Sequence, residues 1–420
     1  MGSGVMQTES GIRSVLLMVH KSVAQDYFRY YNNIIIRELQ ARNIAVDCVD
    51  MTEKTENWSA TAARILRREY DAALVLNSWG EQNVSLDSGE NLFDKAELPF
   101  YNWIMDHPAE HIGHLSTRCQ NYHMICVDRD HVTFLRKYYS DIRSADFLPL
   151  PVDDERNADT SFENFANRGY DVVFSGNCQD KEHMQSLFDQ CPEDRRELLY
   201  FLAGHLLEHR ELSYEAALEE VLEAVFERKI GAEEMREYVS LTIPVIPYIR
   251  ACVREEVIRE LMRSEIRLHL FGKGWERYQK ELSCGNTVLE GTAGFEELSG
   301  VYRNSKMVLN VMPWFRNGSH DRIPMGMFAG AAVVTDHSRY LDEIAEKDDS
   351  GIIFYDIAHP RELEGILKER LYNVEELYKN TITGRTFAEN GMRADAVIDG
   401  LIRIMEREKM AVAAEDYGRI

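Results

Sequence analysis

Short apolar runs alternate with longer amphipathic stretches along the first 150 residues. The runs are Ser14–His20, Ile44–Asp50, Asp71–Asn77, Pro99–Pro108, Tyr122–Asp128 and Ala145–Pro151. A stretch between them, Gln25–Asn43, carries apolar residues at the three- and four-residue spacing of a helix with one buried face. Strands separated by helices of this length predict βαβ units, a parallel sheet and hence a Rossmann-like domain.

The alternation is interrupted after Pro151. Residues 151–169 are polar and show no periodicity, so we interpret them as a linker between domains. A strand at Tyr170–Asn177 follows, and residues 181–263 then carry almost only helical patterns. This helical block is an insertion or subdomain, and the sequence leaves open whether it selects an acceptor, forms a dimer or serves the fold alone.

The strand–helix alternation then resumes. The further strands expected are Ile266–Gly272, Thr287–Gly291, Lys306–Met312, Ala332–Asp336 and Gly351–Asp356, and the tail from Pro360 is helical to about Glu408. A chain of 420 residues exceeds the roughly 250–300 residues at which one core stops growing. We predict a Rossmann-like domain at 11–150, a second at 170–390 with the insertion 181–263, and a C-terminal helix within 391–420 that returns to the first domain. A cleft is expected between the carboxyl ends of the two sets of strands.

Charge and cysteine content narrow the class of protein. The formal net charge of -23 disfavours a general nucleic-acid or anionic-membrane binder, although a local basic pocket for phosphate is compatible with it. Seven scattered cysteines without a CxxC pair favour reduced thiols. The first residues have no secretion-signal pattern, and no apolar run reaches the ~18 residues of a membrane span. We therefore predict a cytoplasmic protein with no transmembrane segment and no nucleic-acid partner.

Several common catalytic motifs are missing from the sequence. No GxGxxG follows the first strand, and GxxxxGK[ST], HExxH, GxSxG and zinc-like Cys/His spacings do not occur. Classical dinucleotide binding and these hydrolytic chemistries are therefore disfavoured, and no metal site is expected.

Glycine-containing turns follow two strands of the second domain. In the turn GKGW, Gly272 and Gly274 permit close approach of the backbone, and Lys273 can reach a phosphate oxygen. A plain turn explains these residues as well. Gly291 begins a loop that either meets a nucleobase through its backbone amides or simply connects two elements.

The stretch NGSHDRIPMGMFAG runs from a polar loop into a helix expected to begin near Ile323 or Pro324. Free amides and the positive end of a helix dipole form an anion site, to which Arg322 can add a bidentate contact. The donor-binding candidates here are Asn317, Gly318, Ser319, His320, Asp321 and Arg322. Capping by Ser319 or Asp321, with Arg322 in solvent, is the alternative. The GKGW turn on a neighbouring strand favours phosphate binding.

A possible base follows a strand of the first domain. Asp106 and His107 stand just past the strand end, and a carboxylate beside an imidazole suits a general base for an acceptor hydroxyl. The alternative is that Asp106 caps the next helix and His107 lies on the surface. His20, after the first strand, is a second candidate, whereas the histidine pair in HIGH, His111 and His114, is expected at the surface.

These segments together resemble the CgeB-like glycosyltransferases, which are group-1-type enzymes with a GT-B fold of two facing Rossmann-like domains. The likeness covers YDVVFSGN, LFGKGW, VYRNSKMVLNVM and HDRIPMGMFAGAAVVTD, and also LPFYNWIMDHP and ICVDRDHVTFLRKYY in the first domain. It leaves out the helical block. The loop and helix ending at Gly330 are its sharpest motif.

The resemblance implies a nucleotide-sugar donor in the second domain. Members commonly carry Glu-Arg-x-Phe-Glu before a glycine, and alignment on Gly330 places the arginine on Arg322 and the first glutamate on Asp321. The second glutamate, which holds the donor ribose, falls on Met325, which cannot accept a hydroxyl hydrogen bond. Asp342 and Glu343 are the possible substitutes.

The resemblance also implies a mechanism without a metal or other cofactor, because the helix dipole and cationic groups neutralise the leaving diphosphate. The expected enzyme is a hexosyltransferase that uses a UDP-linked donor, with Arg322 in a catalytic role. Inversion at the anomeric carbon would need a base, for which Asp106 and His107 are the candidates, whereas retention would not need one of that kind, and the sequence leaves both routes open. The acceptor is a protein, a glycan or a small molecule. Two other functions stay open: a nucleotide-sugar epimerase, and a degenerate, non-catalytic nucleotide- or carbohydrate-binding module.

Overall fold

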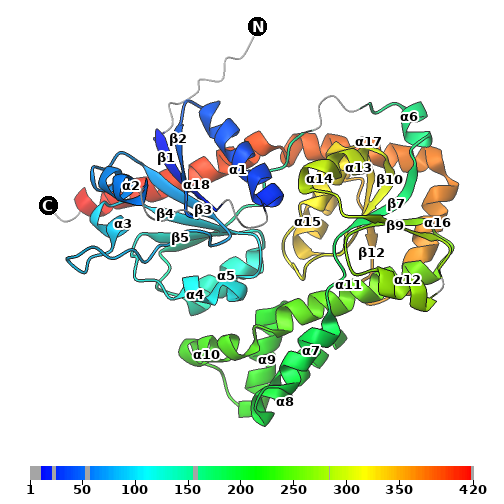
Figure 1. Ribbon diagram of the computed structural model, residues 1–420, viewed down its shortest axis with the longest axis horizontal. Coiled ribbons are helices and arrows are strands. Elements are labelled where there is room, and N and C mark those ends of the chain that lie inside the picture. Colours follow the sequence, from blue (N-terminus) through cyan, green and yellow to red (C-terminus); the bar gives the residue numbers. More distant parts are fainter. Residues whose placement is uncertain (1–10, 21–24, 53–56, 155–158, 283, 418–420) are drawn as a thin grey trace, which may run out of the picture. The chain divides into compact units, whose positions relative to one another are not determined.

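The computed structural model describes residues 11–20, 25–52, 57–154, 159–282 and 284–417. Contacts divide these residues into two compact units, which are drawn in Figure 1 with labels where there is room. Unit 1 holds those within Met1–Cys126, Tyr139–Pro151 and Ala394–Ile420, and unit 2 holds those within Val127–Tyr138 and Val152–Arg393. The segment after the fifth strand thus groups with unit 2, and the domain boundaries inferred above stay a prediction.

Unit 1 contains a parallel sheet of six strands in the order β2-β1-β3-β4-β5-β6. The strands are β1 (Ser14–Val19), β2 (Ala45–Asp50), β3 (Ala72–Leu76), β4 (Phe100–Ile104), β5 (Tyr122–Cys126) and β6 (Ser144–Phe147). Every residue of β3, β4 and β5 is buried, as expected for a parallel sheet covered on both faces. All six apolar runs predicted as strands are confirmed. The order reverses between β1 and β3, which makes their carboxyl ends the ligand position typical of such sheets.

The helices that belong to unit 1 are α1 (Gln25–Gln40), α2 (Asn57–Leu66), α3 (Leu92–Lys95), η1 (Pro108–His111), α4 (Ile112–Leu115) and α18 (Ala394–Tyr417). The C-terminal α18 packs against α1. Arg42 donates to Asp399 at 2.6 Å and to the carbonyl of Asp395 at 2.9 Å. Lys409 pairs with Asp71 at 2.6 Å. Helix α18 is therefore part of unit 1, although it lies at the other end of the sequence.

Unit 2 contains a second parallel sheet of six strands, in the order β12-β11-β10-β7-β8-β9. These are β7 (Tyr170–Ser175), β8 (Leu268–Phe271), β9 (Thr287–Gly291), β10 (Ser305–Leu309), β11 (Ala332–Asp336) and β12 (Ile353–Tyr355), which confirms the remaining predicted strands. Numbered within the unit, this is the 3-2-1-4-5-6 order of a Rossmann fold. Its switch point lies between β7 and β10, so a ligand is expected outside the carboxyl ends of these two strands.

Unit 2 contains the helices that contact this sheet and those of the helical block. They are α5 (Arg129–Tyr138), α6 (Phe162–Ala166), α7 (Lys181–Asp189), α8 (Glu193–Glu208), α9 (Tyr214–Phe226), α10 (Ala232–Thr242), α11 (Val245–Arg263), α12 (Glu276–Leu282), η2 (Phe295–Glu297), α13 (Leu298–Arg303), α14 (Arg322–Phe328), α15 (Arg339–Lys347), η3 (Pro360–Glu362), α16 (Leu363–Tyr372) and α17 (Val374–Gly391). The predicted helical insertion is confirmed as α7–α11.

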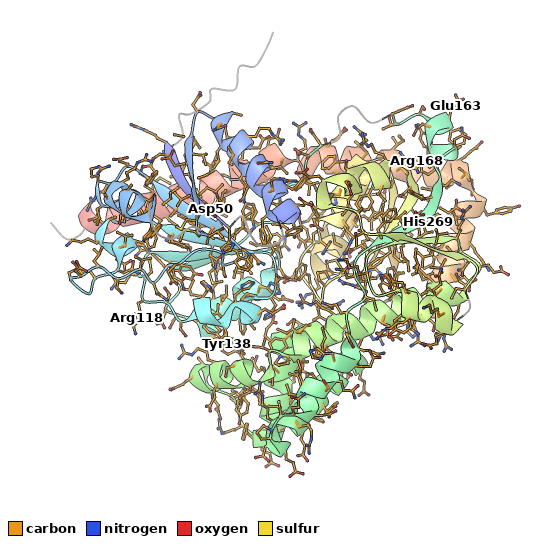
Figure 2. All side chains as sticks on the ribbon, in the orientation of Figure 1. Asp50, Arg118, Tyr138, Glu163, Arg168 and His269 are labelled. Atoms are coloured by element: carbon orange, nitrogen blue, oxygen red, sulfur yellow. The ribbon has the colours of Figure 1, made fainter. Side chains whose placement is uncertain are left out.

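The polar segment 151–169 contains a helix that its sequence pattern does not indicate. Helix α6 begins after Ser161, whose side chain accepts from the Asn164 amide at 3.3 Å. Beyond it lies the buried Arg168, which is labelled in Figure 2. Its guanidinium donates to the carbonyls of Ala329 and Gly330 at 3.1 and 2.7 Å. Arg168 therefore ties the entry of β7 to the end of α14, which is a contact distant in sequence.

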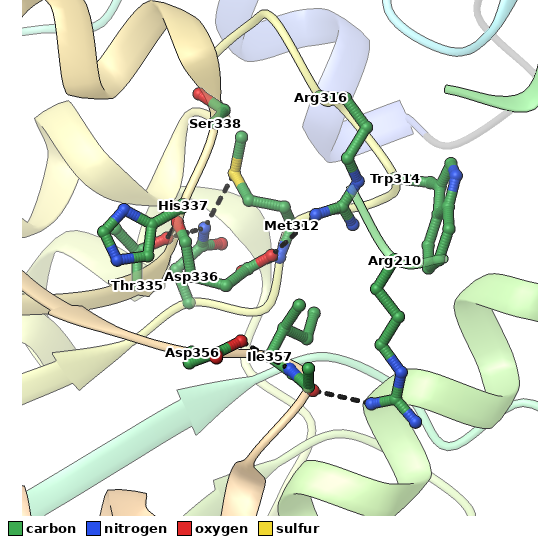
Figure 3. A network of polar contacts seen from close by, with 12 residues as sticks. Arg210, Met312, Trp314, Arg316, Thr335, Asp336, His337, Ser338, Asp356 and Ile357 are labelled. Atoms are coloured by element: carbon green, nitrogen blue, oxygen red, sulfur yellow. Dashed lines mark hydrogen bonds and ion pairs between the residues drawn. The ribbon is translucent and has the colours of Figure 1, made fainter. Parts of the chain in front are cut away.

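The helical block is fastened to the carboxyl ends of the unit 2 sheet. Arg210 donates to the carbonyl of Ile357 at 2.6 Å, just beyond β12 (Figure 3). The indole of Trp314, on the loop after β10, donates to the carbonyl of Leu212 at 3.1 Å. The block is thus placed where the ligand of this sheet is expected.

Two global features agree with the sequence. All seven cysteines are free. Within the described ranges, no helix has the length and apolar character needed to cross a bilayer.

Candidate functional site

Arg322 bridges the two strands that flank the switch point of unit 2. Its Nε donates to the carbonyl of Ser175 at 2.8 Å, at the end of β7, and its Nη1 donates to Asn310 Oδ1 at 3.0 Å, beyond β10. The residue is 9 % exposed, so it does not lie in solvent as the capping alternative requires. A cationic side chain is thus held rigidly at the point where this sheet type binds its ligands.

The GKGW turn packs on the loop that leaves β7, which we call the β7 exit loop (Ser175–Cys178). The amide of Lys273 donates to Asn177 Oδ1 at 2.9 Å, and the Cys178 amide donates to the Lys273 carbonyl at 2.8 Å. A Cβ on Gly272 would lie 2.2 Å from the Gly176 oxygen, and one on Gly274 would lie 2.8 Å from the Cys178 oxygen. Both glycines are therefore needed for loop packing, whatever else they do.

The structure thus brings Gly272, Lys273 and Gly274 to the same exit loop as Arg322. The Lys273 side chain is exposed. Gly291, with φ of +80°, accepts from the Gly272 amide at 2.7 Å. The four predicted donor-binding residues Gly272, Lys273, Gly274 and Gly291 thus lie together at the carboxyl ends of β8 and β9.

A second cation at this loop was missed by the sequence reasoning. The Nη1 of Arg254, on α11, donates to the Asn177 carbonyl at 3.2 Å. Burial, and then the charges of Arg322 and Arg250, lower the pKa of Arg254 to about 9. The four-residue spacing of Arg250 and Arg254, which places them on one face of α11, was the available signal.

The first part of the predicted anion loop is bound to other protein groups. The amide of Asn317 donates to Asp128 at 2.8 Å, and its side-chain nitrogen donates to Asp130 at 3.0 Å. The carbonyl of Gly318 accepts from Ser338 at 2.7 Å, and a Cβ on Gly318 would lie 2.3 Å from the Val127 oxygen. The amide of Asn317 is therefore engaged by a carboxylate rather than presented to an anion.

The second part of that loop leads into α14, which has only seven residues and begins at Arg322. Asp321 is the N-cap residue, but its side chain makes no capping hydrogen bond, which contradicts the capping alternative for this residue. His320 Nδ1 lies 2.7 Å from Asp321 Oδ1. Burial lowers the pKa of His320, and Arg322 and Arg254 add to this effect while Asp321 opposes it. Ser319 is partly exposed.

The residues implied to replace the ribose-binding glutamate have other partners. Met325 is buried within α14. On α15, Asp342 lies 2.7 Å from His337 Nδ1, and Glu343 pairs with Arg129 and Lys347. The structure shows no carboxylate at position 325 and gives both substitutes local roles.

A buried ion pair stiffens the loop after β10 (Figure 3). Arg316 is 5 % exposed, its Nη1 lies 3.4 Å from Asp336 Oδ2, and its guanidinium lies 4.3 Å from the centroid of the Trp314 ring. Asp336 also accepts from the Met312 amide at 2.8 Å. Trp314 has φ of +66°, an uncommon conformation for a bulky residue that surrounding contacts must maintain. This cluster, also missed by the sequence, sets the path of the chain toward Arg322.

Asp128, the anchor of Asn317, makes stability depend on pH. Burial, and next the neighbouring Asp130, raise the pKa of Asp128 to about 7. An unfolded Asp titrates near pH ~3.9, so folding favours the protonated form and stability falls as pH rises from about 4 to about 7. We expect Asp128→Asn to flatten this decline, which amounts to a few kcal/mol at about 1.4 kcal/mol per pKa unit. Urea unfolding of both proteins at pH 5 and pH 8 measures it.

The exposed Asp87 supplies the control for that measurement. Asp87→Asn should leave the difference between pH 5 and pH 8 unchanged. An Asp128→Asn protein with the same pH difference as the wild type would contradict the assignment.

In unit 1, Asp106 is fixed by hydrogen bonding and remains accessible. Asn77 Nδ2 donates to Asp106 Oδ2 at 3.0 Å, His111 Nε2 lies 4.0 Å from the same oxygen, and the carboxylate side chain is 41 % exposed. His107 Nδ1 accepts from the Ala109 amide at 3.1 Å and caps η1. The cap is thus His107 and not Asp106, and His107 is buried rather than on the surface. Because Nδ1 accepts, a neutral His107 carries its proton on Nε2.

Strained backbone lies beside Asp106. Asn77 and Ser78 have φ of 49° and 64°, and the Ser78 amide donates to the buried Asn102 at 2.9 Å. Consecutive left-handed residues other than glycine are unfavourable and cluster at functional sites. His20 contacts the next residue, Trp79, with ring centroids 5.1 Å apart.

Two further observations concern the same edge of unit 1. A cavity of ≈ 500 Å³ at the end of β2 is lined by residues that include Asp50, Trp58 and Glu81. His114 Nδ1 lies 2.8 Å from Gln82, and burial lowers the pKa of His114. The HIGH histidines are therefore partly buried, and their predicted place at the surface is wrong.

Comparison with known proteins identifies the architecture. Residues 250–395 match the model of a family described as glycosyl transferase-like. No curated protein matches the sequence significantly.

Three solved structures illustrate the likeness. HepE of Anabaena, in complex with UDP and glucose, is 12% identical, with a TM-score of 0.51 over 94% of this chain and 100% of that one. A glycosyltransferase of Rickettsia africae is 9% identical, with a TM-score of 0.51 over 94% and 98%. Sucrose-phosphate synthase of Thermosynechococcus elongatus is 10% identical, with a TM-score of 0.52 over 95% and 100%. The chain therefore has a GT-B fold, as predicted, with two Rossmann-like sheets, a helical insertion and a helical C-terminal segment.

Proposed function

We propose that this protein is a glycosyltransferase that moves a sugar from a nucleotide-sugar donor, UDP-linked, to an acceptor hydroxyl without a metal cofactor. The observation that carries the proposal is the placement of Arg322. Its guanidinium is bound to both strands at the switch point, within the region that matches the glycosyl transferase-like family. A cation held in place before the reaction stabilises the charge that develops on a leaving diphosphate.

The donor is proposed to lie across the β7 exit loop. The Nε and Nη1 of Arg322 bind protein groups, while a Cβ on Gly176 would lie 3.3 Å from its Nη2. The Nη2 atom thus lies beside the glycine of the loop, where we propose that it donates to a phosphate oxygen. A side chain at this position would crowd the Phe174 ring, which lies 3.0 Å from the same Cβ. Lys273 adds a mobile positive charge from the neighbouring turn.

Asp106 is proposed as the base on the acceptor side. Its oxygen takes the proton of the acceptor hydroxyl, the acceptor oxygen bonds to the anomeric carbon, and the bond from that carbon to the diphosphate breaks. Asn77 donates to one of the carboxylate oxygens of Asp106 at 3.0 Å and so fixes the orientation of the carboxylate. The cavity beside Trp58 suits a carbohydrate or another polyhydroxylated acceptor, because an aromatic face with nearby carboxylates fits such groups. We place the reaction in the cytoplasm.

A degenerate binding module is the second candidate, and Met325 favours it. The position that holds donor ribose in similar transferases carries a buried thioether here, and Asp342 and Glu343 are engaged elsewhere. Such a module would bind a nucleotide without turning over its sugar conjugate.

A thermal-shift screen with UDP, GDP, CDP, ADP and their common sugar conjugates tests the proposal. A ligand that binds only the folded state at 100 times its Kd stabilises it by about 2.7 kcal/mol, so a clear increase in Tm is expected for UDP and a UDP-sugar. Slow release of UDP from that sugar conjugate would support transfer and reject the module. No shift with any nucleotide at millimolar concentration would reject both functions.

A further inference from the structure

We infer that α11 of the helical block supplies the second half of the anion site, with Arg254 binding one phosphoryl group while Arg322 binds the other. The site would therefore select a diphosphate over a monophosphate. The identity of the anion as a sugar nucleotide rests on the proposed function, but the paired arginines themselves do not.

The two arginines meet at one short segment of chain. Arg322 donates to the carbonyl of Ser175 and Arg254 donates to that of Asn177, two residues further along the β7 exit loop. Their guanidinium carbons lie 5.3 and 6.0 Å from the centroid of the same ring, Phe174. Two elements far apart in the sequence, α11 and α14, thus direct cations to one place.

Arg254 is not satisfied by the protein around it. Among the described residues, its buried Nε has no hydrogen-bond partner and no carboxylate pairs with it. The adjacent glutamates are occupied: Glu255 pairs with Lys181 and Arg259, and Glu256 pairs with Arg210. The guanidinium of Arg254 therefore has an N–H group without a partner among the described residues, and it lies at the β7 exit loop, where ligands of this fold bind.

The electrostatics of the cluster favour an anion. Burial lowers the pKa of Arg254 to about 9, and the positive charges of Arg322 and Arg250 contribute to this shift. Like charges held together in a partly buried place repel each other, and an anion between them replaces repulsion with two attractions. Arg259, one turn further along α11, is paired with both Glu255 and Glu281 and has no such role.

Two guanidinium groups match two phosphoryl groups. Each guanidinium has further N–H groups that can donate to the oxygens of one phosphoryl group. A diphosphate can occupy both arginines, whereas a monophosphate can satisfy only one of them. The helical block, whose role the sequence left open, is thereby assigned to ligand binding.

Calorimetric titration of UMP, UDP and inorganic pyrophosphate tests the inference on the full chain. The variants are Arg254→Gln, Arg254→Lys and, as a matched control, Arg263→Gln, which removes an exposed arginine near the end of the same helix. We expect Arg254→Gln to weaken UDP and pyrophosphate by about 10- to 100-fold, as for the loss of hydrogen bonds to a charged group, and to change UMP by less than about 3-fold. Arg254→Lys should recover part of the loss, and Arg263→Gln should bind all three like the wild type.

The Tm of each variant separates binding from folding. Arg254→Gln should melt at or above the wild-type temperature, because one of the repelling charges is removed. Unchanged UDP and pyrophosphate affinities in this variant, or an equal loss for UMP and UDP, would overturn the inference.

The outcomes also separate this inference from the proposed function. Binding of pyrophosphate that depends on Arg254, without binding of any nucleotide, would support the anion site and reject the glycosyltransferase. Nucleotide binding that is unchanged by Arg254→Gln would support the proposed function and reject the second half of the anion site. A wild-type protein that binds neither pyrophosphate nor UDP would reject both.

Discussion

Replacing Arg322 with lysine is expected to weaken binding of a nucleoside diphosphate by about 100-fold, because removing one partner of a buried charged contact costs about 2–5 kcal/mol. Lysine keeps the positive charge but cannot contact the Ser175 carbonyl, Asn310 and a phosphate at once. A loss of this size would show that diphosphate binding depends on the several N–H donors of the guanidinium and not on its positive charge alone. Isothermal titration with UDP measures it.

The same substitution is expected to affect the fold, since Ser175 and Asn310 lose donors and a buried unsatisfied group costs about 1–3 kcal/mol. Titrations should therefore be made well below the Tm of the variant. Arg339→Lys is a position-matched control, because Arg339 is the first residue of α15 as Arg322 is of α14, but it is exposed and pairs with Asp130. Wild-type UDP affinity in the Arg322→Lys protein would remove the basis of the proposed donor site.

Gly272→Ala is expected to lower the free energy of unfolding by at least about 3 kcal/mol, as overpacking and backbone strain add together. The new Cβ would lie 2.2 Å from the oxygen of Gly176 and 2.6 Å from its carbon, and φ is +156°. The clash is with backbone, which cannot rotate away as a side chain can. Because the β7 exit loop would have to move, we expect weaker UDP binding as well.

Gly365→Ala is the matched control for that substitution. Gly365 lies inside α16, and a Cβ there meets nothing within 4 Å. Alanine should stabilise this helix by about 0.5–1 kcal/mol, the usual difference between the two residues in a helix interior. Urea unfolding of the three proteins measures both effects. A Gly272→Ala protein as stable as Gly365→Ala would show that the two loops do not pack as described.

A site residue could be placed from the sequence where its position depends on a local pattern, and could not be placed where it depends on contacts distant in sequence. The position of Gly272 to Gly274 could be predicted because a turn after a strand is a local pattern, and the strand end places it at the ligand edge of the sheet. Their role in donor binding stays a prediction. Arg322 was found as a lone cation at the start of a helix. Asn317 was expected to bind an anion, but its amide and side-chain nitrogen donate to Asp128 and Asp130. These carboxylates lie nearly 190 residues earlier in the chain, so the sequence around Asn317 does not indicate them.

The sequence by itself determined the two parallel sheets and the elements around them. Alternation of apolar strands with amphipathic helices is a local property, and all twelve predicted runs became strands such as β1, β7 and β11. The short helix α6 was not predicted, because five residues with a single buried phenylalanine show too little periodicity to indicate a helix.

Only the tertiary structure decided which polar residues share a site. Arg254 and Arg322 stand 68 positions apart on different helices, and nothing in either neighbourhood indicates that both reach the β7 exit loop. A helix pattern states which face is polar, but whether that face meets water or another charge depends on where the helix packs. That packing brings two cations together at the carboxyl ends of β7 and β10, where neighbouring side chains and not sequence neighbours determine the chemistry.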